Sequence, residues 1–162
     1  MMQSTNQLEL AKEYNLLPFE VQVLDITRTV CEKIMSLVRF SYGDNAIENL
    51  KNKVRHIYDI HQLLQNKEIK FFFESSDFDE MLLKVAQDDV ESFKLGNSWL
   101  ANHPNDALLF GELEKTWKAI KDTYNNQFKN LVYGELPKDT SILETLQLVE
   151  ERMKTTKWEI KL

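Results

Sequence analysis

The sequence predicts a mainly α-helical protein, a bundle of about five helices with one or two short β-strands, in one domain covering residues 1–162. Apolar residues make up 43% of the chain, which is enough to close a hydrophobic core without a metal or a disulfide. The chain has only four glycines and three prolines, too few for the turns of a many-stranded β fold. Along most of its length, apolar residues recur every three or four positions, the period of an amphipathic helix.

Local signals place the helix ends. Asp25 is a suitable N-cap for the first helix, and Gly134 with Pro137 would end the fourth. Ser141 and Glu144 have the spacing of a capping box at the start of the last helix. The helices are expected at about residues 25–41, 44–66, 77–93, 106–133 and 141–157.

One segment has the alternation of a strand. Residues 19–24 read F-E-V-Q-V-L, with apolar side chains on one face and polar ones on the other. A lone strand cannot satisfy its backbone hydrogen-bonding groups. We therefore expect it to pair with a short segment such as 69–73 or with a sheet that is missing from this chain.

Cysteine content limits the cellular compartments in which the protein is expected, and net charge limits how it can contact nucleic acid. Cys31 is the only cysteine, so no intramolecular disulfide is possible, and the chain opens without a signal-peptide pattern. We expect a cytoplasmic protein with no membrane segment. The net charge of −6 repels nucleic acid at long range, so any contact with phosphate must come from a local patch. Lys51, Lys53, Arg55 and His56 form the only tight positive cluster.

Common catalytic motifs are absent. The sequence has no phosphate-binding glycine loop, no dinucleotide fingerprint, no hydrolase elbow and no zinc-protease motif. The three histidines and Cys31 lack the spacing of metal ligands, so no metal site is predicted. His61 falls near the centre of an apolar stripe, where we expect a hydrogen-bonded core histidine.

An ordered set of segments resembles a known family. Residues 21–39 read V-Q-V-L-D-I-T-R-T-V-C-E-K-I-M-S-L-V-R, and 53–64 read K-V-R-H-I-Y-D-I-H-Q-L-L. Residues 117–137, with their aromatic helix and glycine–proline break, continue the pattern. Together, over roughly residues 8–155, they resemble the nucleotidyltransferase AbiEii/AbiGii toxin family, the toxin arm of bacterial toxin–antitoxin and phage-abortive-infection pairs.

The resemblance implies NTP transfer to RNA, notably tRNA ends, with divalent metal. Lys33 and Asp59 match the family's lysine and second-motif aspartate, and are expected to be catalytic. Glu32, Arg39 and Arg55 are expected to bind substrate. Lys33 projects about 70° from the centre of its helix's apolar stripe, so its ammonium lies at the rim of the packed face and can neutralise NTP phosphate.

Two departures from the family pattern change these expectations. His56 stands where the family has the first acid of R-D-x-x-D. The metal-binding segment, a Gly-Ser followed by paired acids, has no counterpart in the sequence. Mg²⁺ and NTP are therefore expected only for a full-length parent, and this chain is expected to be inactive alone. Its expected partners are a missing N-terminal nucleotidyltransferase half, an antitoxin, the parent's RNA substrate and, for a homodimer, a second copy.

Two other functions remain open. Arg55, His56 and His61 spell R-H-x-x-x-x-H, the loose signature of HEPN-type ribonucleases, although positions six apart on a helix diverge by about 120°. Alternatively, the chain is a non-enzymatic helical module that binds an antitoxin or dimerises through an exposed sheet edge. From spacing alone, Glu32 and Lys33 would lie on a solvated face, and Arg55 with Asp59 would be a surface ion pair worth about 0.2–0.5 kcal/mol.

Overall fold

A computed structural model describes Tyr14 and residues 25–162, and the strand expected at 19–24 lies outside these residues. Helix α2 (Ile26–Phe40) follows Asp25, whose carboxylate accepts a 2.8 Å hydrogen bond from the Thr27 amide, as the capping signal predicts. It ends before Gly43, which has a positive φ of 92° that favours glycine. Of the apolar stripe expected on α2, Val30, Ile34, Leu37 and Val38 are buried, but Ile26 in the first turn is exposed.

The single helix expected at 44–66 is two helices, α3 (Ala46–Lys51) and α4 (Val54–Leu64). At Asn52 and Lys53 the backbone turns with hydrogen bonds between residues three apart, such as Lys53 N to Leu50 O at 2.9 Å. This break lets α3 pack on α8 while α4 packs on α2 and α9. The apolar period continues through the break, so the sequence pattern did not reveal it.

Residues 69–73, expected as a possible strand partner, instead form part of helix α5 (Lys67–Glu74). The Asn66 side chain accepts from the amides of Glu68 and Ile69 and so caps this helix. Ile69 and Phe73, four residues apart, are both buried. Ser75 caps α6 (Ser76–Ser92), which confirms the third predicted helix, and the described residues contain no strand.

The long helix expected at 106–133 is also broken. Two 3₁₀ turns (Ser98–Ala101 and Pro104–Asp106) precede α7 (Leu108–Gly111) and α8 (Leu113–Asp122), and a π-helical turn (Thr123–Gln127) and a further 3₁₀ turn (Phe128–Leu131) follow. Gly111 lies close to the preceding loop, where a Cβ would come within 3.2 Å of the Asn105 carbonyl oxygen. Most of the predicted stripe is buried, but Leu131 is exposed.

Helix α9 (Asp139–Met153) begins two residues earlier than expected. Lys138 precedes it, and the Ser141–Glu144 capping box does not form, because Ser141 already lies in the first turn. The described residues therefore hold eight α-helices rather than about five. None of these helices is long and apolar enough to cross a membrane.

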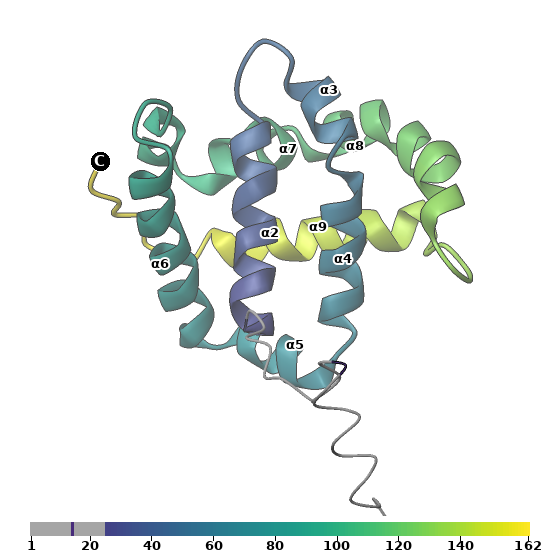
Figure 1. Ribbon diagram of the computed structural model, residues 1–162, viewed down its shortest axis with the longest axis horizontal. Helices are drawn as coiled ribbons and strands as arrows, with labels where there is room; N and C mark the ends of the chain where they lie inside the picture. Colours follow the sequence, from purple (N-terminus) through teal and green to yellow (C-terminus); the bar gives the residue numbers. More distant parts are fainter. Residues whose placement is uncertain (1–13, 15–24) are drawn as a thin grey trace, which may run out of the picture.

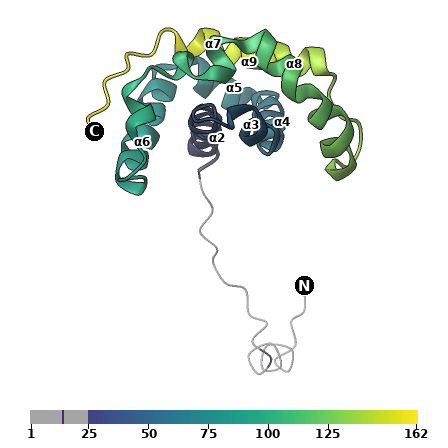
Figure 2. The same ribbon diagram turned by 90° about the horizontal axis from the view of Figure 1, so that it is seen from above.

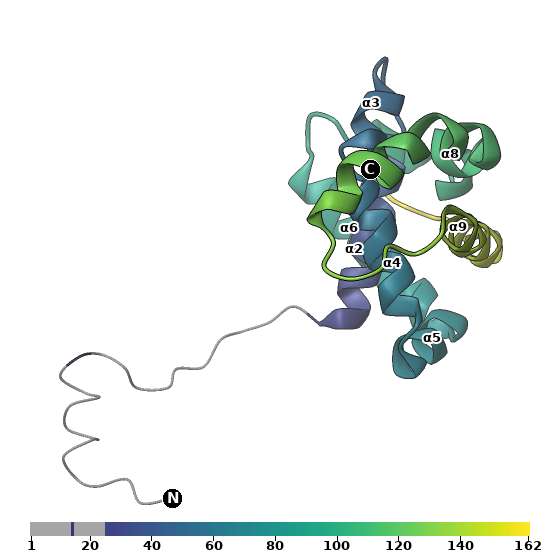
Figure 3. The ribbon, with the colours of Figure 1, turned by 90° about the vertical axis from the view of Figure 1, so that its right-hand side faces the viewer.

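The helices form two main layers. Helix α2 lies between α6 and α4, and α9 crosses behind it (Figure 1). Seen from above, α7, α8 and α9 arch over α2, α3 and α4 (Figure 2). Figure 3 shows α9 on one side of the α2–α4 layer and α5 at its end. The core fills the space between these layers.

The Arg152 side chain connects the two layers. Its guanidinium donates to the backbone oxygens of Phe73 and Ser75, both at 2.8 Å, and pairs with the Asp79 carboxylate at 2.6 Å. It also stacks on the Phe78 ring at 4.8 Å. These bonds join α9 to the junction of α5 and α6.

Candidate functional site

Lys33 and Asp59 meet where α2 packs against α4. The Lys33 ammonium donates a hydrogen bond of 2.7 Å to the Asp59 carboxylate, although the residues are 26 positions apart. The two side chains are only 22% and 23% exposed. In a partly buried setting such a charge-assisted bond is stronger than an exposed ion pair. The structure therefore places the two residues expected to be catalytic in direct contact.

Arg55 lies on the solvent-exposed side of the Lys33–Asp59 contact. Its side chain is 78% exposed, and its Nε is 3.8 Å from the Asp59 carboxylate, which agrees with the ion pair predicted from spacing. At this distance the contact is electrostatic rather than a hydrogen bond. The Arg55 guanidinium can therefore turn toward a ligand at little cost.

His56 is half-buried beside Lys33 and Lys53. Burial, with these two positive charges, lowers the pKa of His56 to about 4, so its imidazole is neutral near pH 7. Its Nδ1 is buried and has no hydrogen-bond partner among the described residues. His56 adds no charge near pH 7, and the Asp59 carboxylate is the group that balances the positive charges of Lys33 and Arg55.

Glu32 and Arg39 lie elsewhere, between α2 and α6. The Glu32 carboxylate accepts from Arg28 at 2.7 Å, and Arg28 also pairs with Asp88 at 2.8 Å. Together with Arg39 and Asp89, these residues line a cavity of about 270 Å³. The five expected site residues are therefore divided between the two sides of α2: Lys33, Asp59 and Arg55 on one, Glu32 and Arg39 on the other.

Aromatic rings hold the Arg39 side chain. Its guanidinium carbon lies 4.7 Å from the centre of the Phe40 ring and 4.2 Å from that of Phe93. Lys53 lies over the same Phe40 ring, at 4.3 Å. Such cation–π contacts fix the plane of a guanidinium while leaving its N–H groups available. Sequence reasoning missed Phe93 and Lys53, because they come from other segments and no local spacing relates them to Arg39 and Phe40.

The amino-acid sequence matches the model of a known protein family. The model for the nucleotidyl transferase AbiEii toxin of type IV toxin–antitoxin systems matches residues 3–150. The chain belongs to the AbiEii toxin family. No curated protein and no solved structure gives a match. As an AbiEii-family protein, the chain is nucleotidyltransferase-like, and its family suggests an antitoxin partner.

His61 of this AbiEii-family chain faces away from Arg55. Its Nδ1 lies 2.7 Å from the Thr145 hydroxyl of α9, so it is a hydrogen-bonded histidine between two helices. It is partly rather than fully buried, and burial lowers its pKa. Arg55 instead points toward Asp59. The two side chains thus have different neighbours, and the geometry gives no support to a ribonuclease site built from them.

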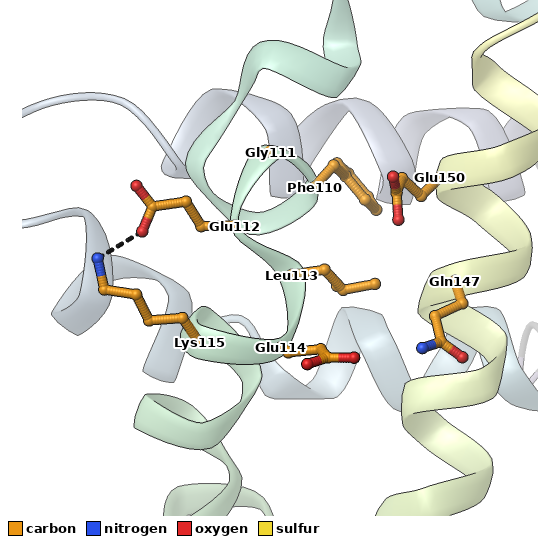
Figure 4. A pocket seen from close by; sticks show the side chains of 8 residues that line it. All are labelled: Phe110, Gly111, Glu112, Leu113, Glu114, Lys115, Gln147 and Glu150. Carbon is orange, nitrogen blue, oxygen red and sulfur yellow. Dashed lines mark hydrogen bonds and ion pairs between the residues drawn. The ribbon is translucent and has the colours of Figure 1, made fainter.

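A cavity of about 450 Å³ lies elsewhere, between α7, α8 and α9 (Figure 4). Phe110, Leu113 and Glu114 point toward Gln147 and Glu150 of α9 across it, whereas Glu112 and Lys115 point away from α9 and pair with each other. Three glutamates line this cavity, which disfavours phosphate, and none of the expected site residues reaches it. Across the described part of the chain, no three acid, histidine or cysteine side chains are close enough to hold a metal ion.

Proposed function

We propose that this chain supplies Lys33 and Asp59 to the active site of a nucleotidyltransferase that transfers a nucleoside monophosphate from NTP to an RNA hydroxyl, with release of pyrophosphate. The contact that carries the proposal is their 2.7 Å hydrogen bond, which joins α2 to α4 beside the exposed Arg55 side chain. The Lys33 ammonium would neutralise triphosphate charge, and Asp59 would orient that ammonium or the attacking hydroxyl. Arg55 and Arg39 would add phosphate contacts.

The proposed site is composite. In-line phosphoryl transfer by this family needs Mg²⁺, and magnesium needs a set of oxygen ligands. The described residues offer no such acid cluster, so we expect an N-terminal nucleotidyltransferase half to provide it. Figure 2 shows α7–α9 covering only one side of α2 and α4. The opposite side would receive the other half, and the chain alone would be inactive.

His56 adjusts the charge of the proposed site. Where the family pattern has a second carboxylate, this chain has an imidazole that is neutral at pH 7. Lys33, Lys53 and Arg55 are then opposed by the single carboxylate of Asp59. An excess of positive charge favours the phosphate groups of NTP and RNA.

Substitution of either member of the pair tests the proposal. In a full-length parent, Lys33→Ala and Asp59→Ala should each lower nucleotide transfer to RNA about 100-fold or more. This is the usual effect of removing a charged group that stabilises the transition state or transfers a proton in it. Incorporation of labelled nucleotide into RNA measures this. Asp59→Asn retains the shape of the side chain and should be equally inactive.

Lys115→Ala is the matched control. Lys115 also pairs with a carboxylate, Glu112, but is 82% exposed and lies on α8, away from the Lys33–Asp59 contact. It should retain transfer, and circular dichroism should show helical folding in every variant. Transfer at the wild-type rate by both Lys33→Ala and Asp59→Ala would falsify the assignment.

We further propose an antitoxin as the protein partner of this chain. Leu131 and Tyr133 are 80% and 105% exposed, and the segment that follows them, 134–140, lines a cavity of about 680 Å³ together with Asn125 and Lys129. Exposed apolar side chains of this size favour protein contact. This also supports a helical interaction module without enzyme activity. Loss of antitoxin binding in Tyr133→Ser, with transfer by the parent unchanged, would distinguish binding from catalysis.

A further inference from the structure

A second pocket lies on the far side of Arg39, where α2 ends. It has a volume of about 510 Å³ and opens between the turn after α2 and the segment that leads into the 3₁₀ turn Ser98–Ala101. Its lining combines a cation, two aromatic rings, two glycines and two small polar side chains: Arg39, Tyr42, Gly43, Gly96, Ser98, Trp99 and Asn102. None of these residues is part of the site that holds Lys33, and Arg39 also lines the cavity between α2 and α6.

Two polar atoms in the wall of this pocket have no well-aligned partner. The indole Nε1 of Trp99 and the phenol oxygen of Tyr42 are buried, and neither makes a well-aligned hydrogen bond with a described residue, although the Asn102 side chain lies near the Tyr42 hydroxyl and partly offsets the rise of its pKa on burial. Trp99 as a whole is only 6% exposed. Only four buried side-chain atoms in the described residues are unpaired in this way, and two of them belong to this one pocket. A buried polar group without a partner is costly, and native proteins rarely retain one without a reason.

The chemistry of these groups indicates what would satisfy them. An indole N–H and a guanidinium can only donate hydrogen bonds. Burial raises the pKa of Tyr42, so its hydroxyl is protonated at neutral pH and also donates. Ser98 and Asn102 can donate as well. Three or more donors around one cation fit a ligand that is anionic and rich in acceptor oxygens.

We propose that this pocket binds a phosphate group, with Arg39 as its charged anchor and Trp99 and Tyr42 as neutral donors. The choice of phosphate rests on the proposed function, in which both substrates carry this group. Phe40 and Phe93 hold the guanidinium plane, so Arg39 is already oriented before a ligand arrives. The phosphate belongs to either a nucleotide or the RNA backbone.

The glycines leave the mouth of this pocket open. A Cβ added at Gly43 or Gly96 would meet no heavy atom within 4 Å. Gly43 has a positive φ, so substitution there would strain the backbone, whereas Gly96 has no such restriction. Gly96→Leu therefore places a large side chain beside the opening without a clash at its Cβ.

Titration of the indole N–H signals by NMR tests the proposal on the 162-residue chain. The three tryptophans give three indole signals, and Trp99→Phe identifies that of Trp99. Separate titrations use inorganic phosphate, ATP and a single-stranded RNA oligonucleotide. We expect the Trp99 signal to move on binding. Tyr42→Phe should weaken binding about tenfold, as for loss of a hydrogen bond to a charged group, and Gly96→Leu should weaken it by obstructing the opening.

A purely structural role predicts different results. Tyr42→Phe removes a hydroxyl that has no well-aligned partner, so the unliganded protein should be as stable as the wild type or more so, while phosphate binding falls. If RNA moves the Trp99 signal and ATP does not, the pocket binds a phosphate of the RNA backbone. If ATP moves the signal, the pocket binds a phosphate of a nucleotide. A Trp99 signal that no probe moves, or binding unaffected by Tyr42→Phe and Gly96→Leu, would overturn the proposal.

Lys33→Ala separates this inference from the proposed function. The pocket contains no atom of Lys33, so this variant should still shift the Trp99 signal with the wild-type affinity. Inactivity of Lys33→Ala with normal binding here would support both proposals. Wild-type transfer by Lys33→Ala and Asp59→Ala would overturn the catalytic proposal alone.

Discussion

The two sides of α2 carry similar residues but differ in charge balance. On the α4 side, Lys33, Lys53 and Arg55 are opposed by one carboxylate, that of Asp59. On the α6 side, two arginines lie among three carboxylates, those of Glu32, Asp88 and Asp89. The Lys33 side has an excess of positive charge that attracts phosphate, whereas the charges between α2 and α6 largely compensate one another, so the phosphate proposed to bind beside Arg39 also needs the neutral donors Tyr42 and Trp99. A charged residue in a motif is thus informative only together with its neighbours.

The largest expected difference is in activity. In a full-length parent, Asp59→Ala should reduce kcat/KM for nucleotide transfer about 100-fold or more, and Glu32→Ala should change it only a few-fold, because Arg28 already pairs with Glu32. Steady-state kinetics of the two variants measures this. An equally severe loss in Glu32→Ala would show that both sides of α2 contribute to the reaction.

Loss of a cation on the α4 side should also destabilise the folded protein more than loss of a cation on the α6 side. Lys33→Met leaves the partly buried Asp59 carboxylate with only the distant Arg55, which should cost about 1–3 kcal/mol of unfolding free energy. Arg28→Met affects carboxylates that remain more exposed, so about 0–1 kcal/mol is expected. Urea unfolding at low salt compares them. If Arg28→Met lost more unfolding free energy than Lys33→Met, the ion pairs on the α6 side would be the more important ones for stability.

The pH dependence of stability separates the two sides of α2 further. The pKa of His56 is about 4 in the folded protein, against 6.5 for a free histidine, so its neutral form contributes stability above pH 6.5. That contribution is lost as the pH falls from 6.5 to 4, by about 1–2 kcal/mol once solvent exposure is considered. His56→Gln should therefore flatten the stability profile in this range. A profile identical to that of the wild type would exclude this role of His56.

The smallest effect is expected at Asp89. Burial raises the pKa of this carboxyl, which means that its contribution is present below pH 3.8 and lost as the pH rises, the opposite sign to His56. Asp89→Asn should therefore increase the unfolding free energy at pH 7 by less than about 1 kcal/mol. Thermal unfolding at pH 7 measures this. If Asp89→Asn lowered the stability of the protein instead, the negative charge of Asp89 would be needed to balance the positive charge of Arg39.

The sequence predicted those elements whose signals are local. Helix α2 has both a capping aspartate and an uninterrupted apolar stripe, and its start was predicted correctly. The breaks at Asn52 and Gly111 were missed, because apolar spacing continues across them and the reason for each lies in distant packing. Residues 69–73, with three adjacent phenylalanines, fit a strand or a helix, and the decisive signal was the Asn66 cap.

The site was predictable only in part, for a similar reason. The position of Lys33 at the rim of its stripe followed from helical geometry, and the importance of Asp59 followed from family resemblance. Periodicity could not reveal that Glu32, next to Lys33 in sequence, faces a different helix and a different set of charges. Nor could it reveal Phe93 beside Arg39 or the unpaired donors of Tyr42 and Trp99, which depend on tertiary structure.

The Arg152 contacts have a consequence for the order of assembly during synthesis. Phe73, Ser75 and Asp79 leave the ribosome long before the guanidinium to which they bond. The junction of α5 and α6 therefore cannot reach its final hydrogen bonding until nearly the whole chain has been made. A chain released early would carry both the Lys33 and the Asp59 helices but not the bonds that hold the layers together, and proteases would be expected to remove it.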